Sequence, residues 1–210
     1  MLDPKALSLY LCTDRILALG RPLLEAVEAA IDGGVTMIQL REKDAGSREF
    51  YDIALAVHEL TGRRGVPLVI NDRLDIALAV DAEGLHIGQS DLPLEAVRKV
   101  AGKRLFVGVS AGTLEEALGA EKEGADYLGV GAVFPTGSKA DAGEAIGTEK
   151  FRAICDAVKI PVVGIGGISP TNAASVLQCS AAGIAVISAI LSQPDIKAAA
   201  ENLRRSMEPA

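Results

Sequence analysis

The chain contains few of the residues on which several common catalytic and metal sites depend. It has three cysteines, Cys12, Cys155 and Cys179, and two histidines, His58 and His86, among 210 residues. The cysteines form no CxxC pair, so neither a disulfide framework nor a zinc site is indicated, and we expect small buried thiols in a reducing compartment. Two histidines are little material for a catalytic triad or a histidine-rich metal centre.

Long apolar runs and excess positive charge are also missing. No apolar run reaches the roughly 18 residues that a membrane span needs, and the first residues, Met1–Lys5, lack a secretory signal pattern. The formal net charge of -7 argues against nucleic acid or an anionic membrane as a partner. No Pro-, Ser- or Gly-rich linker divides the chain. We expect one catalytic domain over residues 1–210, cytoplasmic, with small-molecule partners.

Eight short apolar runs recur along the sequence and alternate with segments of helical spacing. Continuous apolar character over four to six residues is typical of strands buried on both faces of a parallel sheet. Between the runs, Leu23–Ile31, Phe50–Leu60 and Leu114–Leu118 show helical periodicity. The predicted strands are Ser8–Cys12, Val35–Leu40, Pro67–Ile70, Gly84–Ile87, Leu105–Val109, Tyr127–Val130, Pro161–Ile165 and Gly183–Ile187.

This alternation predicts an α/β fold, a single (β/α)8 TIM barrel near the short end of the usual length range. The alternative is an open doubly wound sheet. That fold normally needs fewer strands and often carries a glycine fingerprint after its first strand, whereas Cys12–Arg15 contains no glycine.

Polar clusters follow several of the predicted strands, and in a barrel these strand ends converge on the active site. Arg41 and Lys43 have alternate spacing just past a strand, so both are placed to meet an anion, and Gln39 is placed to hydrogen-bond a neutral heterocycle. The alternative is a solvated surface loop, which is the commoner fate of two loop charges.

Two aspartates after neighbouring strands suggest a cation. Asp72, next to Asn71, and Asp91, before Leu92-Pro93, each fit a helix N-cap when taken alone. Together they match Mg²⁺, which proteins hold with one or two carboxylates plus waters and substrate phosphates.

The last two strands end in groups that suit a phosphate. Gly166-Gly167 follows the seventh run and Ser188 follows the eighth, where barrels commonly bind phosphate on backbone N–H groups. A tight turn with serine helix caps is the alternative. The aperiodic stretch 131–147 predicts a long binding loop or lid after the sixth strand.

Taken in order, these clusters resemble the thiamine phosphate synthase family over nearly the whole chain. Several ordered motifs at compatible spacing are much harder to obtain by chance than one. The motifs are Leu9-Tyr10-Leu11 with Thr13-Asp14, Gln39 to Lys43, Asn71-Asp72-Arg73, His86-Ile87-Gly88-Gln89 with Asp91-Leu92-Pro93, Val109-Ser110-Ala111, Gly129-Val130-Gly131, Val133-Phe134-Pro135-Thr136 and Gly166-Gly167-Ile168.

The resemblance implies a TIM-barrel transferase that joins 4-amino-2-methyl-5-hydroxymethylpyrimidine diphosphate to a thiazole phosphate, giving thiamine phosphate and pyrophosphate. The reaction it implies is Mg²⁺-assisted and dissociative, with the thiazole nitrogen as nucleophile. The resemblance implies that the pyrimidine is contacted by Gln39 and Ser110, and that Mg²⁺ is bound by Asp72 and Asp91. It implies that the diphosphate is bound by Arg41, Lys43, Asn71 and Lys139. The thiazole phosphate would be bound by Thr136, Ser138 and the backbone of Gly167, Ile187 and Ser188. Arg41, Lys43, Ser110 and Lys139 would act directly in catalysis.

Three positions depart from the family pattern: Gly112 is small, Ser138 replaces a common threonine and Ala132 replaces a common proline. A related thiazole tautomerase is the nearest alternative, but it needs a general base and places a histidine where this chain has Ala132. A non-catalytic sensor is the second alternative, although binding a thiazole phosphate alone would not require the cations and the aspartates together. The exposed apolar helix residues leave a monomer and a homodimer open.

Overall fold

Eight parallel strands close into a barrel in the computed structural model, which describes residues 2–138 and 143–208. Each predicted run forms a strand whose ends agree with the prediction within two residues. The TIM-barrel prediction is therefore confirmed, and the doubly wound alternative is wrong. The strands are β1 (Leu9–Cys12), β2 (Met37–Leu40), β3 (Leu68–Asn71), β4 (Gly84–Ile87), β5 (Phe106–Ala111), β6 (Tyr127–Val130), β7 (Val162–Ile165) and β8 (Gly183–Val186).

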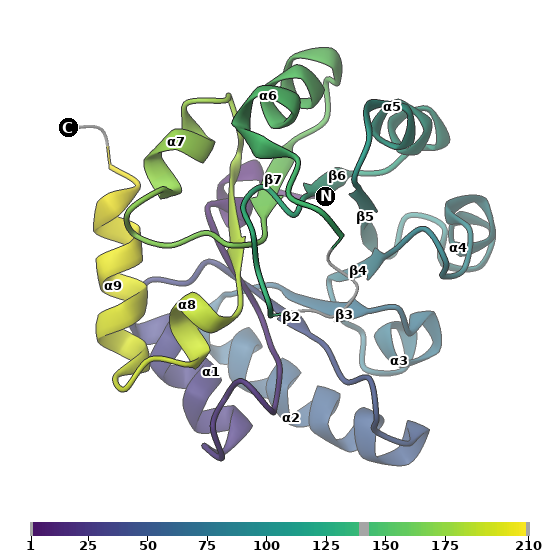
Figure 1. Ribbon diagram of the computed structural model, residues 1–210. Coiled ribbons are helices and arrows are strands. Elements are labelled where there is room, and N and C mark those ends of the chain that lie inside the picture. The colour runs from purple at the N-terminus through teal and green to yellow at the C-terminus, as the bar shows by residue number, and fades with distance from the viewer. Residues whose placement is uncertain (1, 139–142, 209–210) are drawn as a thin grey trace.

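Helices surround the strands as a ring (Figure 1). Each long helix buries one apolar face, as α4 does with Leu94, Val97 and Ala101. Thr113 and Glu116 form a capping box at the start of α5. The helices are α1 (Leu23–Asp32), α2 (Ser47–Arg64), α3 (Leu74–Ala79), α4 (Leu94–Ala101), α5 (Leu114–Glu123), α6 (Gly147–Ala157), α7 (Ala173–Leu177), α8 (Ser188–Leu191) and α9 (Ile196–Ser206).

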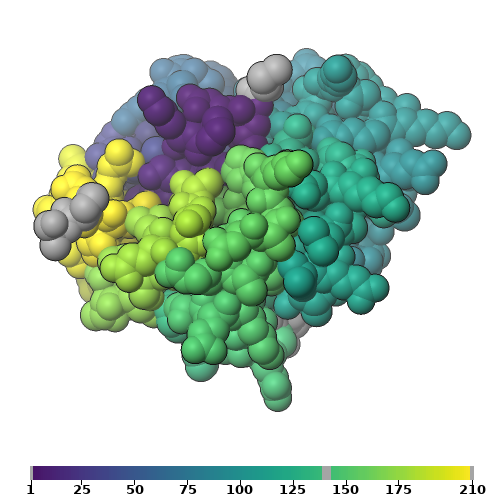
Figure 2. All heavy atoms as spheres, turned by 90° about the horizontal axis from the view of Figure 1, so that it is seen from above, coloured from purple at the N-terminus to yellow at the C-terminus, as the bar shows by residue number. Residues whose placement is uncertain are grey.

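The barrel closes where β1 pairs with β8, with Leu11 opposite Val186 on one side and Ile38 on the other. This pairing brings the beginning and the end of the barrel together, and Figure 2 shows the purple N-terminal residues beside the yellow-green C-terminal ones. Closure leaves no strand edge with unpaired backbone groups. Within the described ranges, no helix is long and apolar enough to cross a membrane.

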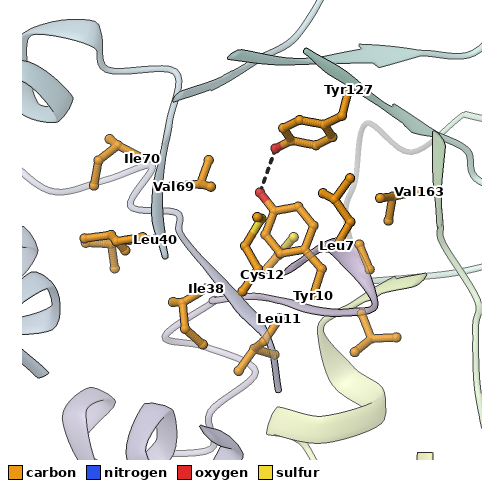
Figure 3. Close-up of a cluster of buried hydrophobic side chains, with 14 of the residues drawn as sticks. Leu7, Tyr10, Leu11, Cys12, Ile38, Leu40, Val69, Ile70, Tyr127 and Val163 are labelled. Carbon is orange, nitrogen blue, oxygen red and sulfur yellow. Dashed lines mark hydrogen bonds between the residues drawn. The ribbon is translucent and has the colours of Figure 1, made fainter. Parts of the chain in front are cut away.

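The barrel interior is mostly aliphatic, but it encloses two tyrosines whose hydroxyls face each other (Figure 3). Tyr10 on β1 and Tyr127 on β6 are both fully enclosed. Gly108 lies opposite Tyr127 in the sheet register, and a Cβ there would come within 2.0 Å of Tyr127 Cζ. Glycine at that position therefore leaves room for the ring, and the interior is packed rather than hollow.

Candidate active site

A pocket of about 420 Å³ opens at the C-terminal ends of the strands, because the loops after β2 to β8 all contribute to its wall. The structure brings together nearly all the predicted site residues there, including some separated by more than half of the chain. Those that line it are Arg41, Lys43, Asn71, Asp72, Asp91, Ser110, Thr136, Ser138, Gly167, Ile187 and Ser188. Lys139 lies outside the residues that the structure describes.

Gln39 lies deeper than the other predicted residues. Its side chain is buried on β2 and lines a recess of about 40 Å³ that shares His86 and Ser110 with the main pocket. Gln39 Nε2 donates to the Tyr10 hydroxyl at 2.7 Å, whereas Oε1 accepts no hydrogen bond from any described residue. A buried oxygen without a donor is costly, so Oε1 is suited to accept from a ligand in the recess.

Two of the three predicted cations, Arg41 and Lys43, are already paired with carboxylates. Arg41 donates to Asp14 at 3.0 Å and Lys43 donates to Asp72 at 2.7 Å. The Arg41 and Asp14 side chains are mostly covered, whereas Lys43 is 47% exposed and its pair contributes little to stability. An anion entering here would share these cations with carboxylates that hold them in place. The partnership with Asp14 was not predicted, because the two loops are adjacent only in the folded barrel.

The two aspartates predicted to bind a cation are not helix caps. The N-cap residues of α3 and α4 are Arg73 and Pro93, and neither helix start has a side-chain cap. Asp72 directly follows β3 in the left-handed region, with φ of 64°, a conformation that costs energy for a residue with a side chain. The capping alternative is therefore wrong for both, and both aspartates line the pocket.

The two carboxylates interact with each other, and their pKa values are shifted in opposite directions. Burial, and then the contact with Asp72, raises the pKa of Asp91. Burial also disfavours charge on Asp72, but hydrogen bonds involving Lys43 and Asp91 outweigh it and hold the pKa of Asp72 below its usual value. The Gly88 N–H fixes Asp91 through a 2.7 Å bond to Oδ2. A second positive charge would relieve this repulsion.

Asp72 and Asp91 fit Mg²⁺, because a bound cation would relieve the repulsion between their carboxylates. Two pocket-facing carboxylates match an ion that proteins hold with one or two carboxylates, keeping waters and phosphate oxygens as its other ligands. The described part of the chain contains no group of three or more histidines, cysteines or acidic residues that could hold a metal. A site that is complete only with a phosphate-bearing ligand is consistent with both observations.

The opposite side of the pocket is neutral and carries hydroxyl and backbone groups. Ser138 Oγ and Ser188 Oγ lie 2.9 Å apart, and Thr136 Oγ1 accepts from the Ser138 N–H at 3.2 Å. Gly166 and Gly167 both have positive φ, and a Cβ on Gly167 would lie 2.6 Å from the Pro135 carbonyl oxygen. Only glycine fits this close turn, which exposes backbone to the pocket.

Further polar residues of the site were not singled out by their chemistry in the sequence. His86 on β4 donates or accepts at both ring nitrogens, to Tyr127 and to Ser110, each at 2.9 Å. Gln89 also lines the pocket and donates to the Ser110 carbonyl at 2.7 Å. The available signal was a polar residue inside an otherwise apolar strand. Ala132 and Gly112, two of the departures from the family pattern, line the pocket too.

Comparison with known proteins agrees with this arrangement. Residues 9–190 match the family model described as thiamine monophosphate synthase. The chain belongs to the thiamine monophosphate synthase family. Over 196 residues it is 56% identical to the thiamine-phosphate synthase of Desulfitobacterium hafniense strain Y51, covering 93% of this chain and 95% of that one. The identity to the Moorella thermoacetica thiamine-phosphate synthase is also 56%, covering 93% of each chain.

Solved structures of other proteins share this fold. The thiamine phosphate pyrophosphorylase of Pyrococcus furiosus superposes with a TM-score of 0.90 at 46% identity, covering 97% of this chain and 96% of that one. A 3-hexulose-6-phosphate synthase matches at 19% identity with a TM-score of 0.73, which shows the shared fold alone. As a member of the thiamine monophosphate synthase family, the chain is a transferase with thiamine-phosphate synthase activity, and the predicted function is confirmed at that level.

Proposed function

We propose that the chain joins 4-amino-2-methyl-5-hydroxymethylpyrimidine diphosphate to a thiazole phosphate, with Mg²⁺ bound, releasing pyrophosphate. The observation that carries this proposal is a single pocket with two chemically different sides. One side holds cations and carboxylates after β2, β3 and β4, and the other holds hydroxyls and glycine backbone after β6, β7 and β8. Two different phosphate-bearing substrates need two such sides.

The pyrimidine ring lies over the recess in this proposal. Gln39 Oε1 accepts from its amino group, which supplies the donor that the described residues do not. The Ser110 hydroxyl contacts the ring from β5, close to the same recess. The ring is thereby held with its methylene carbon toward the pocket mouth, where the second substrate enters.

The diphosphate lies on the charged side. Arg41, Lys43 and Asn71 line that wall, and Lys139 is proposed as a further cation from the sequence motif. Asp72 and Asp91 would hold Mg²⁺, which when bound supplies Lewis-acid neutralisation of charge on the diphosphate. Arg41 and Lys43, each held by its carboxylate partner, share their charge with the phosphoryl oxygens, so positive charge is oriented before the leaving group departs.

The proposed chemistry is a substitution at the methylene carbon. The carbon–oxygen bond breaks and its electron pair leaves with the diphosphate, while the pyrimidine stabilises the resulting methylene cation. The thiazole nitrogen then donates its lone pair to form the new carbon–nitrogen bond. No protein base or nucleophile is required, which is compatible with a chain that has two histidines.

The thiazole phosphate lies on the neutral side in this proposal. Thr136, Ser138 and Ser188 offer hydroxyl donors, and the backbone at Gly167, Ile187 and Ser188 offers N–H groups. Hydroxyl and backbone donors hold a phosphate without adding net charge. This side would therefore bind its substrate without help from Mg²⁺.

The deciding experiment incubates the purified protein with both substrates, with and without Mg²⁺, and quantifies thiamine phosphate and pyrophosphate. We expect equal amounts of both products, and only with the metal. Folded protein that binds the thiazole phosphate but forms neither product would contradict the proposal. Such a result would favour the tautomerase or the sensor, and a proton-transfer assay on the thiazole would separate those two.

We also propose a cytoplasmic location, supported by thiols without a disulfide pattern and by the acidic charge. A homodimer stays a prediction. The exposed Leu55, Val100, Leu114 and Leu118 on the outer helices supply apolar surface for it. Light scattering of the purified protein across a concentration series would distinguish a dimer from a monomer.

A further inference from the structure

A continuous hydrogen-bonded chain runs through the barrel interior beneath the pocket. It starts at Gln39 on β2, passes through Tyr10 on β1, Tyr127 on β6 and His86 on β4, and ends at Ser110 on β5. Its four links measure 2.7, 2.9, 2.9 and 2.9 Å between heavy atoms. Figure 3 shows the second link, where the hydroxyls of the two phenol rings meet inside the barrel.

The number of protons on each residue fixes the donor-to-acceptor direction of this hydrogen-bonded series. Gln39 Nε2 is a donor only, so the Tyr10 oxygen accepts from it and sends its own proton to Tyr127. The Tyr127 proton then goes to His86 Nδ1. Burial raises the pKa of both phenols, so each keeps the single proton on which this count relies. In this direction every proton of the chain has an oxygen or nitrogen acceptor.

The direction determines what the last residue offers to the pocket. If Nδ1 of a neutral His86 accepts, its proton is on Nε2, which donates to Ser110 Oγ at 2.9 Å. Ser110 has then used its oxygen as an acceptor, and its own O–H is left to donate toward the pocket. At the other end, the amide orientation that donates to Tyr10 leaves Gln39 Oε1 as an acceptor. The two ends therefore present opposite hydrogen-bonding character.

We propose that Tyr127 is a positioning residue that holds His86 in the Nε2–H tautomer, and thereby makes Ser110 a donor toward the substrate while Gln39 remains an acceptor. A ligand edge with an amino donor beside a ring-nitrogen acceptor is complementary to this pair, whereas a carbonyl beside a ring N–H is mismatched at both points. The inference rests on the proposed function for its substrate, but its central claim about His86 does not need substrate.

The test is nitrogen NMR of protein labelled with ¹⁵N-histidine. The chain has two histidines, so a His58→Gln variant, altered on α2 away from the pocket, assigns the spectrum. Protonated and unprotonated ring nitrogens differ widely in chemical shift. We expect His86 to carry its proton on Nε2 in the wild-type protein. An Nδ1–H tautomer or an imidazolium at neutral pH would overturn the proposal, and the only variant this measurement uses is His58→Gln, away from the pocket.

Tyr127→Phe then removes the donor to Nδ1 while keeping the ring. We expect the His86 tautomer to shift toward Nδ1–H, and KM for the pyrimidine diphosphate to rise about tenfold, because one hydrogen-bond role at the ring is lost. KM for the thiazole phosphate stays within about twofold. Tyr10→Phe is the matched control: it removes the other buried hydroxyl, but Tyr127 still has His86 as its acceptor, so the tautomer is unchanged.

A folded Tyr127→Phe protein with an unchanged tautomer and unchanged KM would overturn the positioning role. General damage to the core would lower thermal stability in both tyrosine variants, yet would not change the tautomer in only one of them. The NMR result also separates this inference from the proposed function. A wild-type protein with the Nε2–H tautomer and no turnover would contradict the proposed substrates but would leave the inference about His86 standing.

Discussion

The two sides of the pocket, each proposed to bind a phosphate-bearing group, differ in their physical means of doing so. On the charged side, Arg41 and Lys43 are each paired with a carboxylate, and Asp72 and Asp91 lie against each other. On the neutral side, the hydroxyls of Ser138 and Ser188 and the turn at 166–167 carry no ionisable side chain.

This difference teaches where each kind of recognition is useful. Paired charges allow large changes in local charge, since a carboxylate can exchange its cation for a metal or share it with a phosphate. Fixed backbone and hydroxyl donors change little, so they hold a group that does not react. The charged side thus suits a leaving group that gains charge, and the neutral side suits a phosphate that stays on the product.

Removal of the proposed Mg²⁺ gives the largest expected effect. With excess chelator, turnover should fall at least about a thousandfold, because Lewis-acid stabilisation of a leaving diphosphate is worth several kcal/mol. Calorimetry of thiazole phosphate binding under the same conditions should give an unchanged affinity. Parallel loss of both would break the comparison, since it would make the neutral side depend on the cation as well.

Asp91→Ala should lower turnover about a hundredfold while leaving the fold intact, because the side chain faces the pocket and is not a helix cap. Steady-state rates and thermal melts would measure the two effects. Asp75→Ala is the control: it removes a carboxylate paired with Arg73 on α3, outside the pocket, and should keep nearly full activity. Unchanged Mg²⁺-dependent turnover in Asp91→Ala would refute the metal assignment.

Gly167→Ala tests the neutral side. The added Cβ would press on the Pro135 carbonyl oxygen at 2.6 Å in a left-handed conformation, so the turn must shift. We expect KM for the thiazole phosphate to rise about tenfold, with KM for the pyrimidine diphosphate changing less than about twofold. Gly119→Ala on α5, where no atom is near the new Cβ, should leave both unchanged. An equal rise in the two KM values would show that the sides are not independent.

Ser188→Ala gives the smallest expected effect. It removes one hydroxyl, which also contacts Ser138 at 2.9 Å, and one neutral hydrogen bond is worth about 1 kcal/mol. KM for the thiazole phosphate should therefore rise about fivefold. Ser192→Ala, whose hydroxyl bonds to the Leu17 carbonyl outside the pocket, is the matched control. A loss above about a hundredfold would mean that Ser188 does more than donate one bond.

The fold was predictable from sequence because strands of a covered parallel sheet are apolar on both faces, so runs such as Val35–Leu40 and Tyr127–Val130 stand out. Their order then located the site, since polar residues after strands converge in a barrel. That argument brought Arg41 and Asp91 to one pocket without any contact being known.

Contacts across strands were not predictable in the same way. The pairing of Arg41 with Asp14 and the chain through Tyr10 and His86 depend on the barrel's register and on side-chain rotamers, which no local pattern encodes. The capping interpretation of Asp72 failed for a related reason. Its left-handed backbone is imposed by the tertiary structure, although its residue type favours a cap.

The pair of enclosed tyrosines also gives the protein an intrinsic fluorescence that originates beneath the pocket. The chain has no tryptophan, so its intrinsic ultraviolet emission comes from three tyrosines, two of which lie directly beneath the pocket. Phenol emission depends on whether the hydroxyl donates to a base, as the proposed link from Tyr127 to His86 would have it do. If the link has that direction, we expect occupancy of the recess to change this emission, with no dye attached and no residue replaced.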